Sequence, residues 1–121
     1  LMSYFEKIED IYNHIAQGKT LDAFEKYYAD EIVMVMEDGT EVKGKDTNRE
    51  REHEFFSNVE AFNGIEVVGI TANEEEAKTA VESSMDITFK GGNRVTMEQV
   101  AVQDWEGDQV IRERFYGTQQ G

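Results

Sequence analysis

The sequence predicts an α+β fold in which helices near the N-terminus pack on one face of a curved, mostly antiparallel β-sheet. In the first third of the chain, aromatic and aliphatic residues recur every three or four positions, as they do on one face of a helix. From residue 65 onward the segments are rich in β-branched and aromatic residues, which favour strands. Short loops containing Gly, Asn or Glu separate these segments and are typical of sequential hairpins.

Three helices are expected. The first covers residues 3–17, where the apolar side chains share one face, and Gly18 suits its C-terminal end. Thr20 is placed to cap a second helix that reaches residue 28. A third helix is expected over residues 46–58, which are polar except near the C-terminal end, so that end should rest on the sheet.

The strands are expected in two groups. Residues 32–36 form an apolar strand, the Asp38-Gly39 pair favours a tight turn, and residues 41–43 return. Four longer strands then follow in a meander, over residues 65–71, 78–90, 94–105 and 109–118. A long sheet that bends around helices leaves a hollow between the layers, and such hollows bind small molecules.

The composition limits the class of protein. The chain has 121 residues, enough for one domain, which we place at residues 2–121 because we expect the natural chain to begin at Met2. A net charge of −14 with scattered basic residues argues against nucleic acid as a partner. No apolar run is long enough to span a membrane, so a cytoplasmic protein is expected. The chain has no cysteine and only two histidines, so we expect no metal and no cofactor.

Three stretches of the chain resemble the NTF2-like superfamily, and in particular its SnoaL-like members. They are residues 18–31 (GKTLDAFEKYYADE), 38–46 (DGTEVKGKD) and 104–117 (DWEGDQVIRERFYG). The resemblance implies a cystatin-like cone, with three N-terminal helices on a curved sheet of mixed order. It also implies a homodimer through the outer face of the sheet and a pocket between sheet and helices, whose use differs among members.

Ketosteroid isomerase, which shares this fold, resembles the chain from the first helix to the first strand. Its active-site tyrosine falls on Tyr12, its general base falls on Met36, and its protonated oxyanion-hole carboxylate falls at or near Ala101. Met and Ala cannot exchange protons, so steroid-type isomerisation is disfavoured. Members that open epoxides need an Asp–Arg–Asp constellation, which the acidic residues here do not obviously supply.

Strand alternation, in the absence of a bulge, separates the two faces of the last hairpin. With the family positions as anchor, Arg112, Arg114 and Tyr116 should face the helices. The outward residues of the hairpin then form an apolar stripe, which a second copy of the chain should cover: Val100, Val102, Ile111 and Phe115.

The predicted ligand site has mostly apolar walls with a few polar groups. Its residues are Tyr12, Met34, Met36, Phe56, Met97, Gln99, Gln103, Arg114 and Tyr116. Arg114 is the sharpest candidate, because a guanidinium on a cavity wall needs an anion. That anion is either a carboxylate of the protein or an acidic or enolate group of a ligand.

Two functions remain open. In the first, the domain binds a small, largely apolar molecule carrying an acidic or carbonyl group, without a defined reaction. In the second, it is a SnoaL-like isomerase, cyclase or lyase acting on a polyketide-like metabolite, with His53 carrying the proton and Tyr12 and Arg114 stabilising an enolate. The lack of matched carboxylates favours the first.

Overall fold

The computed structural model describes residues 1–120, with side chains up to Thr118. Two helices and a two-stranded hairpin precede the third helix, and four longer strands follow it. In chain order they are α1 (Tyr4–Ala16), α2 (Thr20–Tyr27), β1 (Tyr28–Val35), β2 (Glu41–Lys43), α3 (Lys45–Ser57), β3 (Val59–Asn73), β4 (Lys78–Phe89), β5 (Arg94–Glu106) and β6 (Gln109–Gln120).

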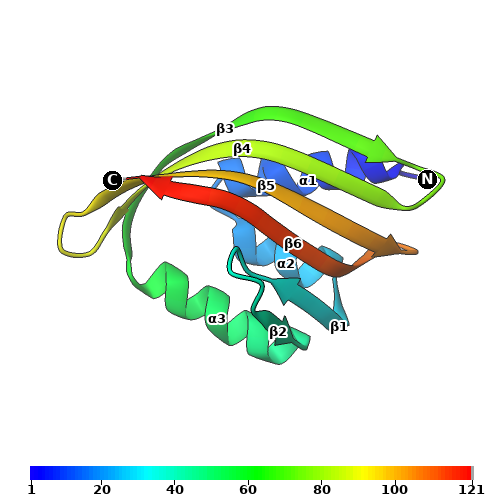
Figure 1. Ribbon diagram of the computed structural model, residues 1–121, viewed down its shortest axis with the longest axis horizontal. Coiled ribbons are helices and arrows are strands. Elements are labelled where there is room, and N and C mark those ends of the chain that lie inside the picture. The colour runs from blue at the N-terminus through cyan, green and yellow to red at the C-terminus, as the bar shows by residue number, and fades with distance from the viewer. Residues whose placement is uncertain (121) are drawn as a thin grey trace.

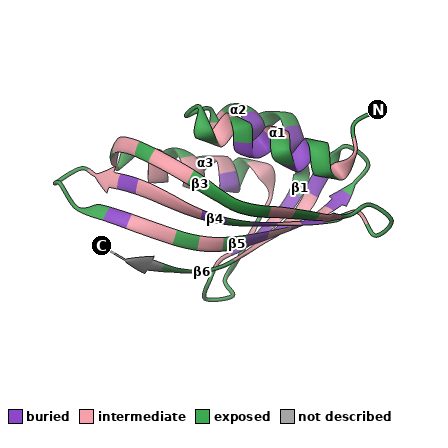
Figure 2. Ribbon diagram, turned by 90° about the horizontal axis from the view of Figure 1, so that it is seen from above, coloured by how far each residue is buried: buried purple, intermediate pink, exposed green. Residues whose placement is uncertain are grey.

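The strands form one mixed sheet in the order β2-β1-β6-β5-β4-β3. All neighbours are antiparallel except β1 and β6, which run parallel. The helices lie on one side of the curved sheet (Figures 1 and 2). The predicted α+β class, with three helices and a sheet of mixed order, is therefore confirmed. Only α1 and α2 precede the first strand, however, because α3 follows the β1–β2 hairpin.

The helix starts differ in how they are capped. At α1, the side chain of Ser3 accepts a hydrogen bond from the backbone of Glu6, and the Glu6 carboxylate accepts one from the backbone of Ser3. At α2, Lys19 is the N-cap and makes no side-chain capping bond, so the predicted cap at Thr20 is wrong. This helix is held instead by its buried face, which includes Phe24 and Tyr27.

The start of α3 is fixed to the β1–β2 hairpin. Gly44 precedes the helix with a φ of 91°, a conformation that glycine adopts without strain. The fully buried side chain of Asn48 then donates hydrogen bonds to the carbonyl oxygens of Val42 and Gly44, both at 2.9 Å. These contacts set the rotation of the helix about its axis. Residues three, four and seven positions after Asn48 therefore lie on the side that faces the sheet.

A bulge in the last hairpin reverses the predicted facing of β6. Asp104 pairs with Arg112 and Trp105 pairs with Val110, so Ile111 is an extra residue on β6. The residues beyond it exchange faces relative to an unbroken alternation. Predictions that assumed no bulge therefore fail here.

The bulge corrects several predicted positions of β6. Arg112, Arg114 and Tyr116 pair with outward-facing Asp104, Val102 and Val100, so they lie on the outer face rather than toward the helices. Phe115 pairs with the buried Ala101 and lies on the inner face, so it does not belong to the outer apolar stripe. Ile111, predicted in the same stripe, is the bulge residue itself.

Gly117 of β6 lies against the backbone of β5. A Cβ at this position would meet the backbone carbonyl oxygen of Glu98 and would lie 3.0 Å from the Cα of Gln99. Because backbone atoms cannot move aside, we expect Gly117→Ala to lower the free energy of unfolding by about 1 to 3 kcal/mol. Urea denaturation measures this, with Thr118→Ala as the exposed control. An unchanged midpoint would contradict the close approach.

The main hydrophobic cluster lies between α1, α2 and one end of the sheet. It includes Ile8, Ile11, Phe24, Trp105 and Val110, all at most 4% exposed. The other end of the layer between α3 and the sheet is less filled. Among residues 1–120, no helix has the length and apolar character of a membrane span.

Candidate functional site

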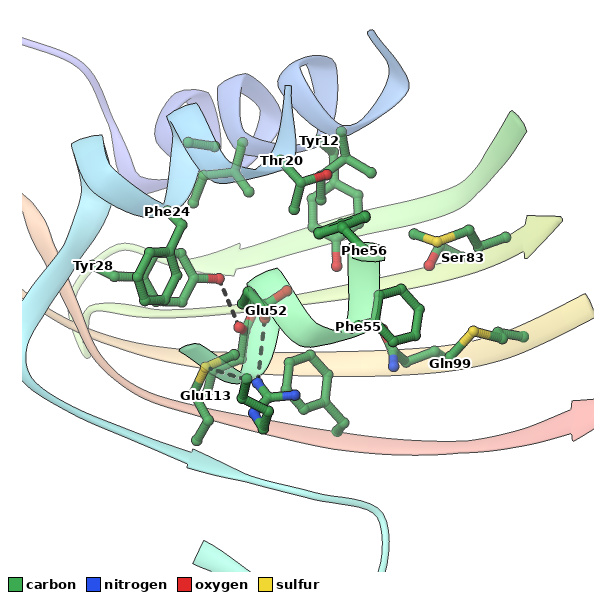
Figure 3. Close-up of a pocket in the computed structure, with 18 of the residues that line it drawn as sticks. Tyr12, Thr20, Phe24, Tyr28, Glu52, Phe55, Phe56, Ser83, Gln99 and Glu113 are labelled. Atoms are coloured by element: carbon green, nitrogen blue, oxygen red, sulfur yellow. Dashed lines mark hydrogen bonds and ion pairs between the residues drawn. The ribbon is translucent and has the colours of Figure 1, made fainter. Parts of the chain in front are cut away.

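A cavity of about 360 Å³ lies between the helices and the inner face of the sheet. Figure 3 shows it from the side, with α3 bordering it and residues of α1, α2 and the strands pointing inward. Most of the wall is aromatic or methionine side chain, including Phe24, Phe55, Phe56 and Met85. A volume of this size holds a small organic molecule. A few polar groups interrupt this wall, and the charged ones include Glu113, Glu52 and Arg51.

Glu113 of β6 is the most buried of these polar groups, with only 3% of its surface exposed. One carboxylate oxygen accepts a hydrogen bond of 2.6 Å from the hydroxyl of Tyr28. The other accepts one of 2.7 Å from the side-chain amide of Gln103. The bulge at Ile111 is what turns this carboxylate inward, where it lines the cavity.

Three residues behind Glu113 fix its orientation. The indole N–H of Trp105 donates to the hydroxyl of Thr79 at 2.9 Å, and this hydroxyl donates to the amide oxygen of Gln103 at 2.7 Å. The amide nitrogen of Gln103 is therefore turned toward Glu113. Because each donor in this series of hydrogen bonds has one acceptor, the carboxylate of Glu113 is held in one position.

Burial raises the pKa of Glu113 from 4.5 to about 7. The hydrogen bonds from Tyr28 and Gln103 lower the pKa, and the nearby charge of Glu52 raises it, but loss of hydration is the largest cause. At neutral pH the carboxyl group is therefore present in both its protonated and its ionised form. A group of this kind both accepts and donates protons under physiological conditions.

Arg51 and Glu52 of α3 complete the charged part of the wall. A terminal nitrogen of Arg51 lies 3.2 Å from a carboxylate oxygen of Glu52 and 3.3 Å from the sulfur of Met34. Burial raises the pKa of Glu52, while the positive charge of Arg51 opposes this rise. The guanidinium and the carboxylate form a short ion pair beside Glu113.

Tyr12 of α1 brings a hydroxyl group to the same space. Its ring is buried, and its hydroxyl points into the cavity (Figure 3). Burial and the charge of Glu113 raise its pKa well above the ordinary value, so the hydroxyl stays protonated. It is a hydrogen-bond donor available to a molecule in the cavity.

The comparisons with known proteins agree with this architecture. The family model described as SnoaL-like domain matches residues 4–117. The chain belongs to the SnoaL-like domain family. The comparison with curated proteins gives no match.

Solved structures similar to this SnoaL-like domain include a candidate SnoaL-like polyketide cyclase from Mesorhizobium loti. It is 28% identical, the match covers 95% of this chain and 99% of that chain, and the TM-score is 0.81. An LEH-like epoxide hydrolase of M. tuberculosis is 16% identical, with 95% and 82% covered and a TM-score of 0.76. A candidate isomerase from Bacillus subtilis is 12% identical, with 97% and 90% covered and a TM-score of 0.80. The last two show the fold alone.

Most of the predicted ligand-site residues of this SnoaL-like domain lie at the cavity wall. They are Tyr12, Met34, Met36, Phe56, Met97 and Gln99. Gln103 is on the same face but lies behind Glu113, fully buried. Arg114 and Tyr116 are not at the wall, because the bulge places them on the outer face. There the Arg114 guanidinium lies 4.7 Å from the centre of the Tyr116 ring.

The structure does not place His53, the proton carrier of the second hypothesis, at the cavity. His53 is exposed and is not among the lining residues, whereas its neighbours Arg51 and Glu52 are. Asn48 orients the helix, so the inward positions are 51, 52, 55 and 56 rather than 53.

The sequence reasoning missed the carboxylates of Glu52 and Glu113. Glu52 could have been predicted, because it lies four residues after Asn48 and four before Phe56 on one helical face. Glu113 carried no such signal, because its facing depends on the bulge. Among residues 1–120, no group of three or more metal-ligating side chains is gathered.

Removal of the Tyr28 hydroxyl should raise the pKa of Glu113 further. In Tyr28→Phe the carboxylate of Glu113 loses a hydrogen bond that favours its ionised form. The pKa of Glu113 should therefore rise by about one unit. A carboxyl-selective ¹³C NMR titration measures the change. Tyr27→Phe is the matched control, because the hydroxyl of Tyr27 bonds Asp10 instead. Equal titration midpoints in wild-type protein and Tyr28→Phe would contradict the assigned contact.

Proposed function

We propose that this SnoaL-like domain binds a small, mostly apolar carbonyl compound in the cavity and transfers a proton at the carbon beside the carbonyl. The observation that carries this proposal is the buried carboxyl group of Glu113 at an otherwise apolar wall, with a pKa of about 7. Such a group is suited to general acid–base catalysis at neutral pH. The absence of a carboxylate at Met36 and Ala101 no longer argues against catalysis, because β6 and α3 supply carboxylates instead.

Two residues of the wall have separate roles in the proposed reaction, Glu113 in proton transfer and Tyr12 in hydrogen bonding. Ionised Glu113 removes the proton, so the C–H bond breaks and its electron pair moves into the carbonyl group to form an enolate. The hydroxyl of Tyr12 donates a hydrogen bond to the oxygen that gains the charge. Glu113 then returns the proton, at another carbon in an isomerisation or to the oxygen formed after ring closure in a cyclisation.

A relative supports a reaction of this class. The M. loti protein that is similar over nearly its whole length is a candidate polyketide cyclase. Ring closure of a polyketide by carbon–carbon bond formation begins with proton removal beside a carbonyl group. A polyketide-like metabolite is accordingly the substrate class that we propose.

Deuterium exchange tests the proposal with a simple probe. 2-Acetylnaphthalene carries a carbonyl group, exchangeable methyl protons and an apolar body smaller than the cavity. In D₂O at pH 8, wild-type protein should increase the rate of deuteration of the methyl group above the buffer rate, as measured by ¹H NMR. A probe that binds, by calorimetry, but exchanges only at the buffer rate would reduce the function to binding.

We also propose a homodimer through the outer face of the sheet. Val68, Val100 and Tyr116 border a shallow hollow on this face and are 55%, 38% and 50% exposed. Apolar groups gathered on one face favour burial against a second copy. Val100→Asp should shift sedimentation toward the monomer. Phe5→Asp, which alters an equally exposed residue of α1, should not, and equal behaviour of the two variants would contradict the interface.

A further inference from the structure

The charged groups at the cavity wall carry an excess of negative charge. Among the described residues that line it, the ionisable acids are Glu37, Glu52 and Glu113, and the basic side chain is Arg51. At pH 8, with the three acids ionised, the formal charge of this set is −2. Glu37 is exposed at the mouth, so water screens it, whereas Glu52 and Glu113 are in a poorly hydrated region.

Arg51 compensates only part of this excess. One terminal nitrogen of its guanidinium already contacts Glu52 and Met34. Its Nε is buried, with essentially no accessible surface, and 33% of the side chain as a whole is exposed. The charge of Arg51 is therefore balanced by Glu52, and the ionised Glu113 beside them remains unbalanced.

The second guanidinium expected at the site lies elsewhere. Arg114 was the predicted partner of a ligand's acidic group, but the bulge places it on the outer face of the sheet, against Tyr116. Among the described residues that line the cavity, the basic side chain is therefore Arg51 alone, and it is already paired with Glu52. It does offer a neutral donor, the hydroxyl of Tyr12, to a neutral acceptor.

We propose that the cavity selects uncharged, largely apolar molecules with a hydrogen-bond acceptor and rejects the corresponding carboxylates. This inference rests on the proposed function for the location of the binding site, and it names the charge class of the substrate. A ligand carboxylate placed beside Glu113 meets a like charge where the effective dielectric constant is low. Such a contact costs far more than it does in water.

The rejection depends on pH through the groups that face Glu113. These are Tyr12 from α1, Tyr28 from β1, and Arg51 and Glu52 from α3. Both tyrosines stay neutral from pH 5 to 8, because burial raises their pKa values. Protonation of Glu113 as the pH falls through about 7 removes the repelling charge. Carboxylate binding should then improve and be accompanied by proton uptake.

Isothermal titration calorimetry with two matched probes tests the inference. 2-Acetylnaphthalene and 2-naphthoate share one ring system and differ in charge. At pH 8 the ketone should bind wild-type protein at least about tenfold more tightly than the carboxylate, and the ratio should fall toward pH 6. In Glu113→Gln the carboxylate should bind more tightly than in wild-type protein at pH 8, with little pH dependence. Glu54→Gln, which removes an exposed carboxylate of α3 away from the cavity wall, is the control and should retain the wild-type ratio.

The outcomes separate this inference from the proposed function. Equal affinity of wild-type protein for both probes at pH 8, or no gain of carboxylate affinity in Glu113→Gln, overturns the charge selection even where deuterium exchange is seen. Ketone preference without exchange supports the charge selection and contradicts catalysis. If neither probe binds at any pH, both proposals are overturned.

Discussion

Replacement of Glu113 by Gln is expected to slow deuterium exchange of bound 2-acetylnaphthalene by about 10²- to 10⁴-fold, the range typical of a lost general base. The affinity for the ketone should change little, because Gln has the same shape. Its amide oxygen can accept from Gln103 while its amide nitrogen donates to the oxygen of Tyr28. The rate constant at saturating probe, measured by ¹H NMR, separates the lost proton transfer from lost binding.

The exchange rate should also depend on pH in a defined direction. Glu113 must be ionised to remove a proton, so the wild-type rate should rise through about pH 7 and level off above it. Glu54→Gln should keep this profile, because its carboxylate is exposed on α3 and does not line the cavity. A wild-type rate that falls on going from pH 6 to pH 8, or full activity in Glu113→Gln, would contradict the assigned role.

The second large effect is on stability. Between pH 5 and pH 8, wild-type protein should lose about 2 to 3 kcal/mol of unfolding free energy relative to Glu113→Gln. The unfolded chain releases the proton of Glu113 near its ordinary pKa of 4.5, whereas the folded protein holds it to about 7. In this window the folded state binds more protons, so its stability falls as the pH rises. The physical reason is that the ionised carboxylate loses its hydration when it is buried, which lowers the unfolding free energy.

Urea denaturation of both proteins at several pH values measures this difference. Comparison with the variant cancels the contributions of the other ionisable groups, which are common to both chains. Glu82→Gln, an exposed change on β4, controls for the loss of one negative charge from a strongly acidic protein. Parallel pH dependences of wild-type protein and Glu113→Gln would show that the folded carboxyl group titrates as it does in the unfolded chain.

The fold was readable from the sequence because local patterns decide it. The helical spacing in residues 3–17 and the hairpin loops after Asn73 and Lys90 were sufficient to predict α1 and the β3–β4–β5 meander. Element ends were less readable. The strand predicted at residue 65 begins at Val59, because pairing with β4 extends it directly from the end of α3.

The candidate site was readable only in part. The apolar wall follows from alternation along strands whose facing was correct, as with Met34, Met97 and Gln99. One inserted residue at Ile111 exchanged the roles of Glu113 and Arg114, replacing an expected cation by a carboxylate. No local pattern distinguishes this bulge from a regular strand, because it arises from pairing between β5 and β6. The proposed chemistry therefore changed with a single residue of register.

The titration of Glu113 itself tests the central claim most directly. Carboxyl ¹³C NMR of protein labelled at Glu, with the resonance assigned by its loss in Glu113→Gln, gives the pKa without any ligand. The buried and hydrogen-bonded geometry predicts a midpoint of about 7. A midpoint near 4.5, the ordinary value for Glu, would mean that water reaches this carboxylate freely, and it would remove the proton carrier from the proposed site.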